Sequence, residues 1–219
     1  MSIKIDLRIF LFGVLFFLTK QIEIYAILMI FALLHELGHL CAGLALGFKP
    51  ESISINPMGF QIAFHTKVED YNKKIQKGNE LCLKKIVIAL AGPLVNLFII
   101  IFCLCLEQDF IIAKETIIYS NLLLAIFNLL PIYPLDGGRI LKQILHIYKG
   151  RKVANRYITT VSKITVILLT ILVSITILYI HNLAFIIVLA YLWYLVFQNQ
   201  KRYELYQKMI KETCYNSYL

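Results

Sequence analysis

The sequence contains few charged residues and few cysteines for its length. Asp, Glu, Lys and Arg make up 16% of its 219 residues, whereas about 25% is usual in a soluble protein. Hydrophobic residues make up 59%, against roughly 45–50% in soluble domains, and they form blocks long enough to cross a bilayer. This composition excludes a soluble enzyme, a disordered tail and a nucleic-acid-binding domain, so we expect the bilayer to be the main solvent.

The five cysteines predict no disulfide framework, because they are an odd number without paired spacing. Cys103 and Cys105 are two positions apart in an apolar run, so on a helix they point about 200° apart and do not suit a shared metal ion. We expect them to pack as small apolar side chains.

Hydropathy predicts an all-α polytopic membrane protein with about six transmembrane helices. The expected spans are residues 7–19, 22–47, 86–106, 110–130, 157–180 and 183–198. No cleavage site follows Leu18, so we expect the first run to be an uncleaved span and not a signal peptide. We expect residues 1–199 to form the membrane core and residues 200–219 a short cytoplasmic tail, with 199–216 as an amphipathic helix on the inner membrane surface.

Lys and Arg are unequally distributed between the loops of this topology. One side carries 20 of the 22, and only Lys20 and Lys114 fall near the other side. Because positive charge is retained on the cytoplasmic side, we expect an integral, multi-pass membrane protein with both termini in the cytoplasm. Topology alone accounts for these basic residues, and none requires a ligand.

Two segments after the second span have a distinct pattern. Residues 53–64 alternate apolar and polar on either side of Asn56-Pro57-Met58-Gly59, which suits a type I turn. This pattern predicts a membrane-associated β-hairpin. Residues 66–85 are polar and basic and predict a solvated linker.

The second span contains the pattern H-E-x-x-H at His35, Glu36 and His39. Histidines four apart lie on one face of a helix and can reach a single zinc ion, while the glutamate can deprotonate a water at the metal. Ionisable groups inside a membrane span are costly, which makes them functional candidates. The alternative is that these side chains act as polar glue between helices.

A hydrolytic zinc ion needs a third protein ligand, and Asp136 is the leading candidate. The residue lies in the run 128–139, NLLPIYPLDGGR, where two prolines end the fourth span and Gly137 and Gly138 permit a tight turn. At about 1.5 Å per residue, His39 and the end of the fourth span both fall in the cytoplasmic third of the bilayer. Asp136 could instead be a helix N-cap or an ordinary turn residue.

Asn96 and Asn128 are further polar candidates in the spans. Their amides could bind the substrate backbone or a developing oxyanion, and interhelical hydrogen bonding explains each of them equally well. Gly92 and Pro93, just before Asn96, allow a kink and close helix approach. His65, His146 and His181 lie outside any ligand spacing and stay unassigned.

The motifs at residues 35–39, 91–96 and 128–137 together resemble the site-2 protease family of intramembrane zinc metalloproteases. The resemblance covers residues 31–139 and implies that His35, His39 and Asp136 bind one zinc ion per chain, with Glu36 as general base. It also implies a membrane-associated protein substrate that is cut in or near the bilayer.

Within the family, the six-span plan without a PDZ domain resembles the stage IV sporulation (SpoIVFB) branch. This resemblance implies a pro-sigma-K-type substrate, inhibitory membrane partners of the SpoIVFA/BofA type, and the mother-cell membrane around the forespore. Members of that branch typically continue into a CBS domain, whereas about twenty residues follow the last expected span here. Nucleotide sensing is therefore not expected to carry over.

We expect a substrate segment to unwind and pair with the 53–64 hairpin, because an extended backbone exposes its carbonyls. Two other interpretations stay open. The same protease could act on an anti-sigma factor or a signal-peptide remnant, or the chain could be a zinc transporter or an inactive scaffold. Glu36 argues against the last group, since coordination by two histidines alone does not need that carboxylate.

Overall fold

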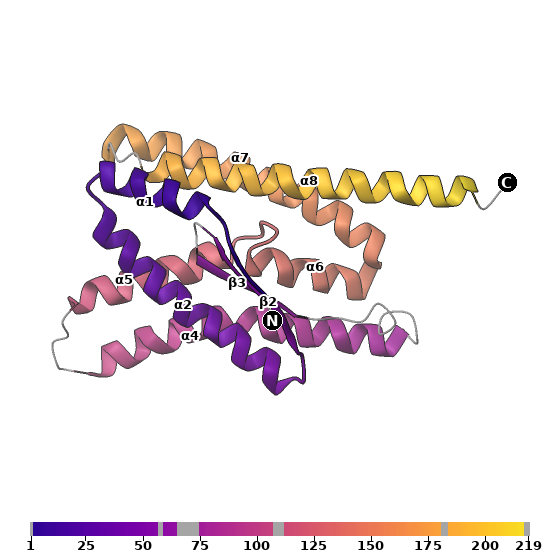
Figure 1. The fold of residues 1–219 in the computed structure, drawn as a ribbon, viewed down its shortest axis with the longest axis horizontal. Helices are drawn as coiled ribbons and strands as arrows, with labels where there is room; N and C mark the ends of the chain where they lie inside the picture. The colour runs from indigo at the N-terminus through magenta and orange to yellow at the C-terminus, as the bar shows by residue number, and fades with distance from the viewer. Residues whose placement is uncertain (1, 57–58, 65–74, 107–111, 181–183, 217–219) are drawn as a thin grey trace. The chain divides into compact units, whose positions relative to one another are not determined.

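The computed structural model describes residues 2–56, 59–64, 75–106, 112–180 and 184–216. The chain divides into two compact units, Met1–Leu129 (unit 1) and Leu130–Leu219 (unit 2). Figure 1 labels the helices of both units and the strands β2 and β3 of unit 1. The described part is mostly helical with one small sheet, which confirms the expected helical class and the hairpin.

Unit 1 is built on helices that match four of the expected spans. They are α1 (Arg8–Leu18), α2 (Ile22–Ala45), α4 (Ile75–Cys105) and α5 (Lys114–Asn128). Helices α2, α4 and α5 pack on one another. Their shared apolar core includes Phe31, Cys103 and Leu124. Cys103 therefore packs as a small apolar side chain, as expected, whereas Cys105 is exposed on the helix surface.

A three-stranded sheet completes unit 1. Strands β2 (Pro50–Asn56) and β3 (Gly59–Phe64) form the expected antiparallel hairpin, in which Ile53 lies opposite Ile62. Strand β1 (Ser2–Ile5), which the hydropathy pattern does not indicate, pairs in parallel with β2. The order β1-β2-β3 leaves β3 as an edge strand, and β3 packs against α2 (Figure 1). Positions 57–58 of the expected type I turn lie outside the described residues.

Unit 2 consists of α6 (Asp136–Lys149), α7 (Arg151–Ile180) and α8 (Ala184–Asn216). The expectation of a tight turn at Gly137 and Gly138 was wrong, because both glycines lie in the first turn of α6. The chain turns earlier, where the Leu135 N–H donates to the Ile132 carbonyl (2.8 Å). A Cβ on Gly138 would collide with the Ile132 backbone, so glycine here allows that turn to lie against the helix.

Two other boundaries differ from the hydropathy pattern. Helix α4 begins at Ile75, so residues 75–85 extend a span and are not a linker, while residues 66–74 lie outside the described part. Residues 199–216 are helical, as expected, but they continue α8 without a break. Continuous backbone hydrogen bonding explains both differences, since a helix end is not required where the side chains become polar.

Three helices in the described part are long and apolar enough to cross a membrane: Ile22–Ala45, Gly78–Cys105 and Arg151–Tyr179. Helix α1 is shorter, with an apolar run at Ile9–Leu18. Large apolar side chains such as Phe98 and Leu178 are two-thirds or more exposed. Such surfaces are stable in lipid and unfavourable in water.

Candidate metal centre in unit 1

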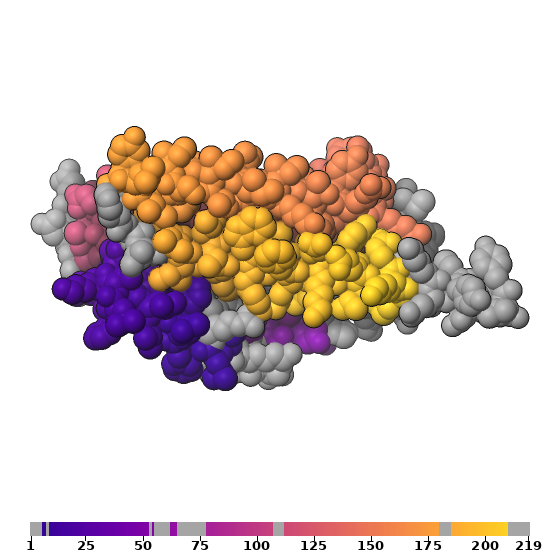
Figure 2. Space-filling model, turned by 90° about the horizontal axis from the view of Figure 1, so that it is seen from above, coloured from indigo at the N-terminus to yellow at the C-terminus, as the bar shows by residue number. Residues whose placement is uncertain are grey.

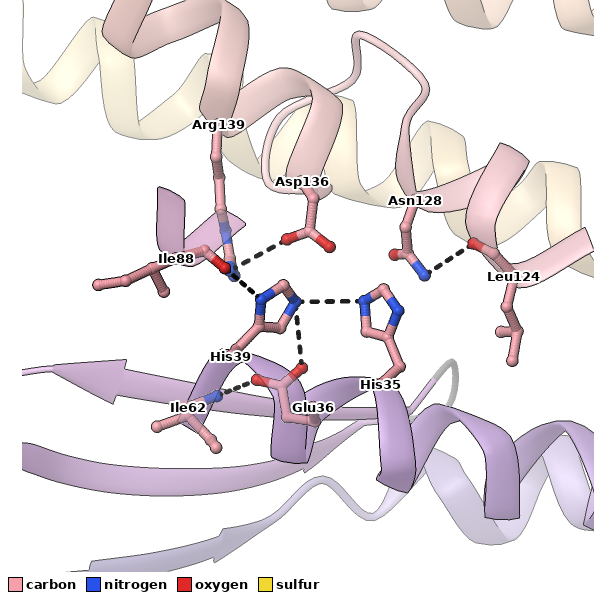
Figure 3. A network of polar contacts seen from close by, with 9 residues as sticks. All are labelled: His35, Glu36, His39, Ile62, Ile88, Leu124, Asn128, Asp136 and Arg139. Carbon is pink, nitrogen blue, oxygen red and sulfur yellow. Dashed lines mark hydrogen bonds and ion pairs between the residues drawn. The ribbon is translucent and has the colours of Figure 1, made fainter. Parts of the chain in front are cut away.

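The H-E-x-x-H residues lie on one turn of α2 and are buried. His35 is 4% exposed, Glu36 7% and His39 2%. Helix α4 and strand β3 pack against α2 and supply the backbone groups that contact these side chains (Figure 3). Burial of three ionisable side chains is costly unless they are paired or hold a metal ion, so the arrangement indicates a polar centre inside unit 1.

The imidazole of His39 is oriented by a backbone carbonyl. Its Nδ1 lies 2.7 Å from the Ile88 oxygen of α4, and because a carbonyl can only accept, the proton must be on Nδ1. The Nε2 atom of His39 then carries a lone pair. Metal-binding histidines usually have this arrangement, in which the second ring nitrogen donates to a carbonyl or carboxylate.

The two histidines present their Nε2 atoms to the same place. These atoms lie 3.2 Å apart, and two nitrogens each 2.0–2.1 Å from a tetrahedral zinc ion would be about 3.3 Å apart. Gly92 of α4 lies directly beside them, since a Cβ on this residue would come within 2.5 Å of both Nε2 atoms. The donor set, its spacing and the glycine beside it fit a zinc ion.

Glu36 is held by the edge strand of the sheet. Its Oε1 accepts a hydrogen bond of 2.6 Å from the Ile62 N–H of β3, and its Oε2 lies 4.0 Å from the Nε2 of His39 (Figure 3). One carboxylate oxygen is thus fixed by the protein backbone, and the other faces the histidine pair. This is a suitable geometry for a general base beside a metal-activated water.

Asp136 belongs to unit 2, where it is the first residue of α6 and is 4% exposed. The Nη1 atom of Arg139, one turn later, lies 3.4 Å from its Oδ1. The start of a helix and a neighbouring guanidinium both favour a negatively charged carboxylate. Asp136 is therefore prepared to act as an anionic ligand.

The two asparagines differ in their surroundings. Asn96 of α4 is fully buried, and neither atom of its amide has a hydrogen-bond partner among the described residues. Asn128, at the end of α5, donates from Nδ2 to the carbonyl of Leu124 in its own helix (3.0 Å, Figure 3). The environment of Asn96 suits a binding role, whereas the Asn128 amide satisfies its own helix.

The sequence pattern did not indicate two contacts of this centre. They are the hydrogen bond from the Ile62 N–H to Glu36 and the close approach of Gly92 to the two histidines. A backbone N–H leaves no mark on the residue type, so no sequence signal could have identified Ile62. Gly92 was recognised as a site of close approach, and its pairing with the histidines depends on how α4 packs on α2.

Comparison with known proteins gives consistent matches. The model of peptidase family M50 matches residues 106–172. The chain is 37% identical over 128 residues to a zinc metalloprotease of Methanocaldococcus jannaschii, which covers 56% of this chain and 34% of that protein. It is 28% identical over 127 residues to stage IV sporulation protein FB of Bacillus subtilis, covering 57% of this chain and 41% of that protein. The chain thus matches less than half the length of either relative.

A solved structure extends the match to most of the chain. The site-2 protease from Methanocaldococcus jannaschii superposes with a TM-score of 0.66 and 28% sequence identity. The alignment covers 90% of this chain and 89% of that one.

Proposed function

Because the chain belongs to peptidase family M50, the site-2 proteases, we propose that it is an intramembrane zinc endopeptidase that cuts a membrane-associated protein. The observation that carries this proposal is the centre on α2. There two imidazole nitrogens lie 3.2 Å apart beside a glycine, next to a glutamate that is fixed by the edge of a sheet. A site that only stores or transports a metal has no need of that fixed carboxylate.

The proposed metal ligands are His35, His39 and Asp136, with one zinc ion per chain. The histidines supply neutral nitrogen donors, and Asp136 supplies a carboxylate that begins a helix and is paired with Arg139. With these three protein ligands, a bound zinc ion would have room for a water ligand, as hydrolytic zinc sites require.

Glu36 is the proposed general base and general acid. A zinc ion held by His35, His39 and Asp136 would supply Lewis-acid chemistry, that is, polarisation of the scissile carbonyl and a pKa of about 7 for water at the metal. Glu36 Oε1 is engaged by Ile62, so we assign proton transfer to Oε2. Oε2 takes a proton from the attacking water as the C–O bond forms, and it returns this proton to the leaving nitrogen as the C–N bond breaks.

Strand β3 is the proposed docking edge for substrate. This strand lies at the edge of the sheet and packs on α2. Its Ile62 N–H donates a hydrogen bond to Glu36. An extended substrate segment that pairs with this edge would present its carbonyls beside the catalytic carboxylate. Pairing would also satisfy the hydrogen bonds of the substrate's backbone groups, which have no water to bind inside the bilayer.

Asn96, with its buried amide, is proposed to bind the substrate backbone or the developing oxyanion. Asn128 remains a second candidate for the same role.

The proposed substrate is a pro-sigma-K-type sigma factor precursor, supported by the match to stage IV sporulation protein FB. Inhibitory membrane partners of the SpoIVFA/BofA type and a mother-cell membrane location belong to the same proposal. An anti-sigma factor or a signal-peptide remnant is the alternative substrate. The proposed topology has six spans with both termini in the cytoplasm, as the Lys and Arg distribution favours.

The test is co-expression in bacteria of the full chain with a pro-sigma-K-type substrate, comparing wild type, Glu36→Gln and Asp136→Asn on a blot. The purified membrane protein is also assayed for zinc. Wild type is expected to shorten the substrate and bind one zinc ion. Glu36→Gln is expected to keep the zinc but lose cleavage, and Asp136→Asn is expected to lose both.

The two assays separate the parts of the proposal. A zinc-loaded wild type that cuts nothing would overturn the sporulation substrate and leave an anti-sigma factor or signal-peptide remnant to be tried. A wild type without zinc would overturn the metal site. Full cleavage by Glu36→Gln would overturn the assignment of the base.

A further inference from the structure

Unit 2 contains a polar pocket that the proteolytic centre does not use. It has a volume of about 140 Å³ and lies among α6, α7, α8 and the segment before α6. Its walls include two cations, Lys142 of α6 and Arg202 of α8, together with Tyr133, Asn155 and Asn199. The pocket lies entirely within unit 2, so its description depends on this unit alone.

Positive charge predominates around this pocket. Unit 2 has eleven Lys and Arg against three Asp and Glu, so it carries +8 of the net +9 of the chain. Neither Asp136 nor Glu204 is among the described residues that line the pocket. Asp136 pairs with Arg139, and Glu204 Oε1 accepts from Gln200 Nε2 (2.8 Å). A concave site whose described lining holds two cations and no acid attracts an anion.

Donor groups in the wall suit the oxygens of that anion. The Nδ2 atom of Asn199 is shielded from solvent and has no hydrogen-bond partner among the described residues. The guanidinium of Arg202 offers several N–H donors in a planar fork that matches phosphate geometry. Lys142 Nζ lies over the Tyr133 ring, 4.4 Å from its centroid, and this contact holds the ammonium in the pocket wall.

The position of the pocket along the helices indicates the source of the anion. The lining residues of α8 begin at Asn199, directly after its apolar run ends at Phe197, and those of α7 are near its polar start. Figure 2 shows the orange side chains of α7 lying along the yellow side chains of α8. Tyrosines at such a boundary sit at headgroup level, and basic pockets between membrane helices bind phospholipid headgroups.

We propose that this pocket binds a phosphate group, supplied by the headgroup of an anionic phospholipid. Its volume is well below the roughly 300–1,000 Å³ of pockets for drug-sized ligands, so it suits a phosphate or phosphoglycerol group. The other possible source is free phosphate, which has the same chemistry. The site does not depend on the proteolytic function, and it assigns to Lys142 and Arg202 a role beyond setting topology.

The test uses the full chain in nanodiscs of phosphatidylcholine containing increasing phosphatidylglycerol, with bound lipid counted by native mass spectrometry. A second arm titrates inorganic phosphate into the protein in pure phosphatidylcholine. The variants are Arg202→Gln, Lys142→Gln and Asn199→Asp, which puts a negative charge in the wall. Lys201→Gln is the matched control, because it removes the same charge one residue away and does not line the pocket.

We expect one tightly held phosphatidylglycerol in the wild type. Each pocket variant should weaken it by about tenfold or more, since a charged hydrogen bond is lost or opposed, whereas Lys201→Gln should weaken it by less than about fivefold. Saturable phosphate binding that Arg202→Gln abolishes, with no retained lipid, would support the site and assign free phosphate to it. Equal effects of Arg202→Gln and Lys201→Gln would overturn the proposal, because only general charge would then matter. Binding of neither probe would overturn it as well.

Discussion

At the residue scale, Gly92 is the position where a single methyl group should decide metal binding. A Cβ here would lie 2.5 Å from the Nε2 atoms of His35 and His39. We expect Gly92→Ala to lower zinc affinity by about 10- to 100-fold, the range for changes that disturb ligand orientation. The matched control is Gly13→Ala, since nothing lies within 4 Å of a Cβ on Gly13. Zinc content of both purified variants measures the effect, and equal zinc in the two would contradict the geometry.

A substitution at Asn96 can show whether its amide binds substrate or supports the packing of the helices. Its amide is fully buried and has no partner among the described residues, and such a group costs about 1–3 kcal/mol of stability. We expect Asn96→Leu, of similar size, to leave the thermal midpoint unchanged or raised while it lowers cleavage by about 100-fold. A lower midpoint with normal cleavage would instead favour an interhelical hydrogen bond. Thermal unfolding and a cleavage assay on the same preparation decide between them.

The sequence alone could predict those site residues whose distances from one another are set by a single helix. His35, Glu36 and His39 are spaced so that any helix brings them together, and the structure has them so. Ile62 and Gly92 contribute through packing, which the sequence pattern does not encode. Asp136 lies between these two cases. Its residue type and its burial fit a metal ligand, but its role as a ligand stays a prediction.

At the element scale, β3 is the proposed docking edge and also holds Glu36, the proposed base. The Ile62 N–H donates to Glu36 and so is not needed for pairing with β2. Proline is tolerated at an edge strand where its N–H is not part of the ladder. We therefore expect Ile62→Pro to keep the zinc ion but lower kcat by about tenfold, because Glu36 loses its fixed orientation.

The control for that variant is Ile62→Ala, which removes the buried side chain but keeps the N–H. Packing loss should lower the stability of this control by about 2–5 kcal/mol, while its kcat should stay near the wild-type value. The two variants are compared by steady-state kinetics on purified protein. A normal kcat for Ile62→Pro would exclude a role for the strand in holding Glu36.

Helices and strands could be predicted where the hydrophobic residues alternate or form long runs. Short elements without such a pattern could not. The hairpin and the long apolar helices follow directly from the sequence pattern. Helix α6 was missed because Asp136-Gly137-Gly138 is typical of a turn, and packing against α7 outweighs the low helix propensity of glycine. Strand β1 was missed because four residues carry too little pattern, and its pairing with β2 comes from distant contacts.

At the scale of the whole molecule, charge is divided unevenly between the two units. Unit 1 has eleven Lys and Arg against ten Asp and Glu, a net charge of +1, whereas unit 2 carries +8. A concentrated positive charge suits a unit that meets the anionic inner surface of a membrane.

The same distribution predicts the orientation of the chain. Positive charge near span ends stays in the cytoplasm, and 20 of the 22 Lys and Arg fall on one side of a six-span arrangement. We therefore expect fluorescent-protein fusions at both ends to fluoresce and alkaline phosphatase fusions at both ends to be inactive. The control is a phosphatase insertion between Lys20 and Gln21, where α1 ends and α2 begins, which should be active. Three helices of the described part are long and apolar enough to cross a membrane, so the fusions test whether the remaining expected spans also cross it.

Ends on opposite sides would require an odd number of spans. The first span would be the one to reconsider, since α1 has only 11 residues and about 20 are needed to cross the bilayer without tilt or thinning.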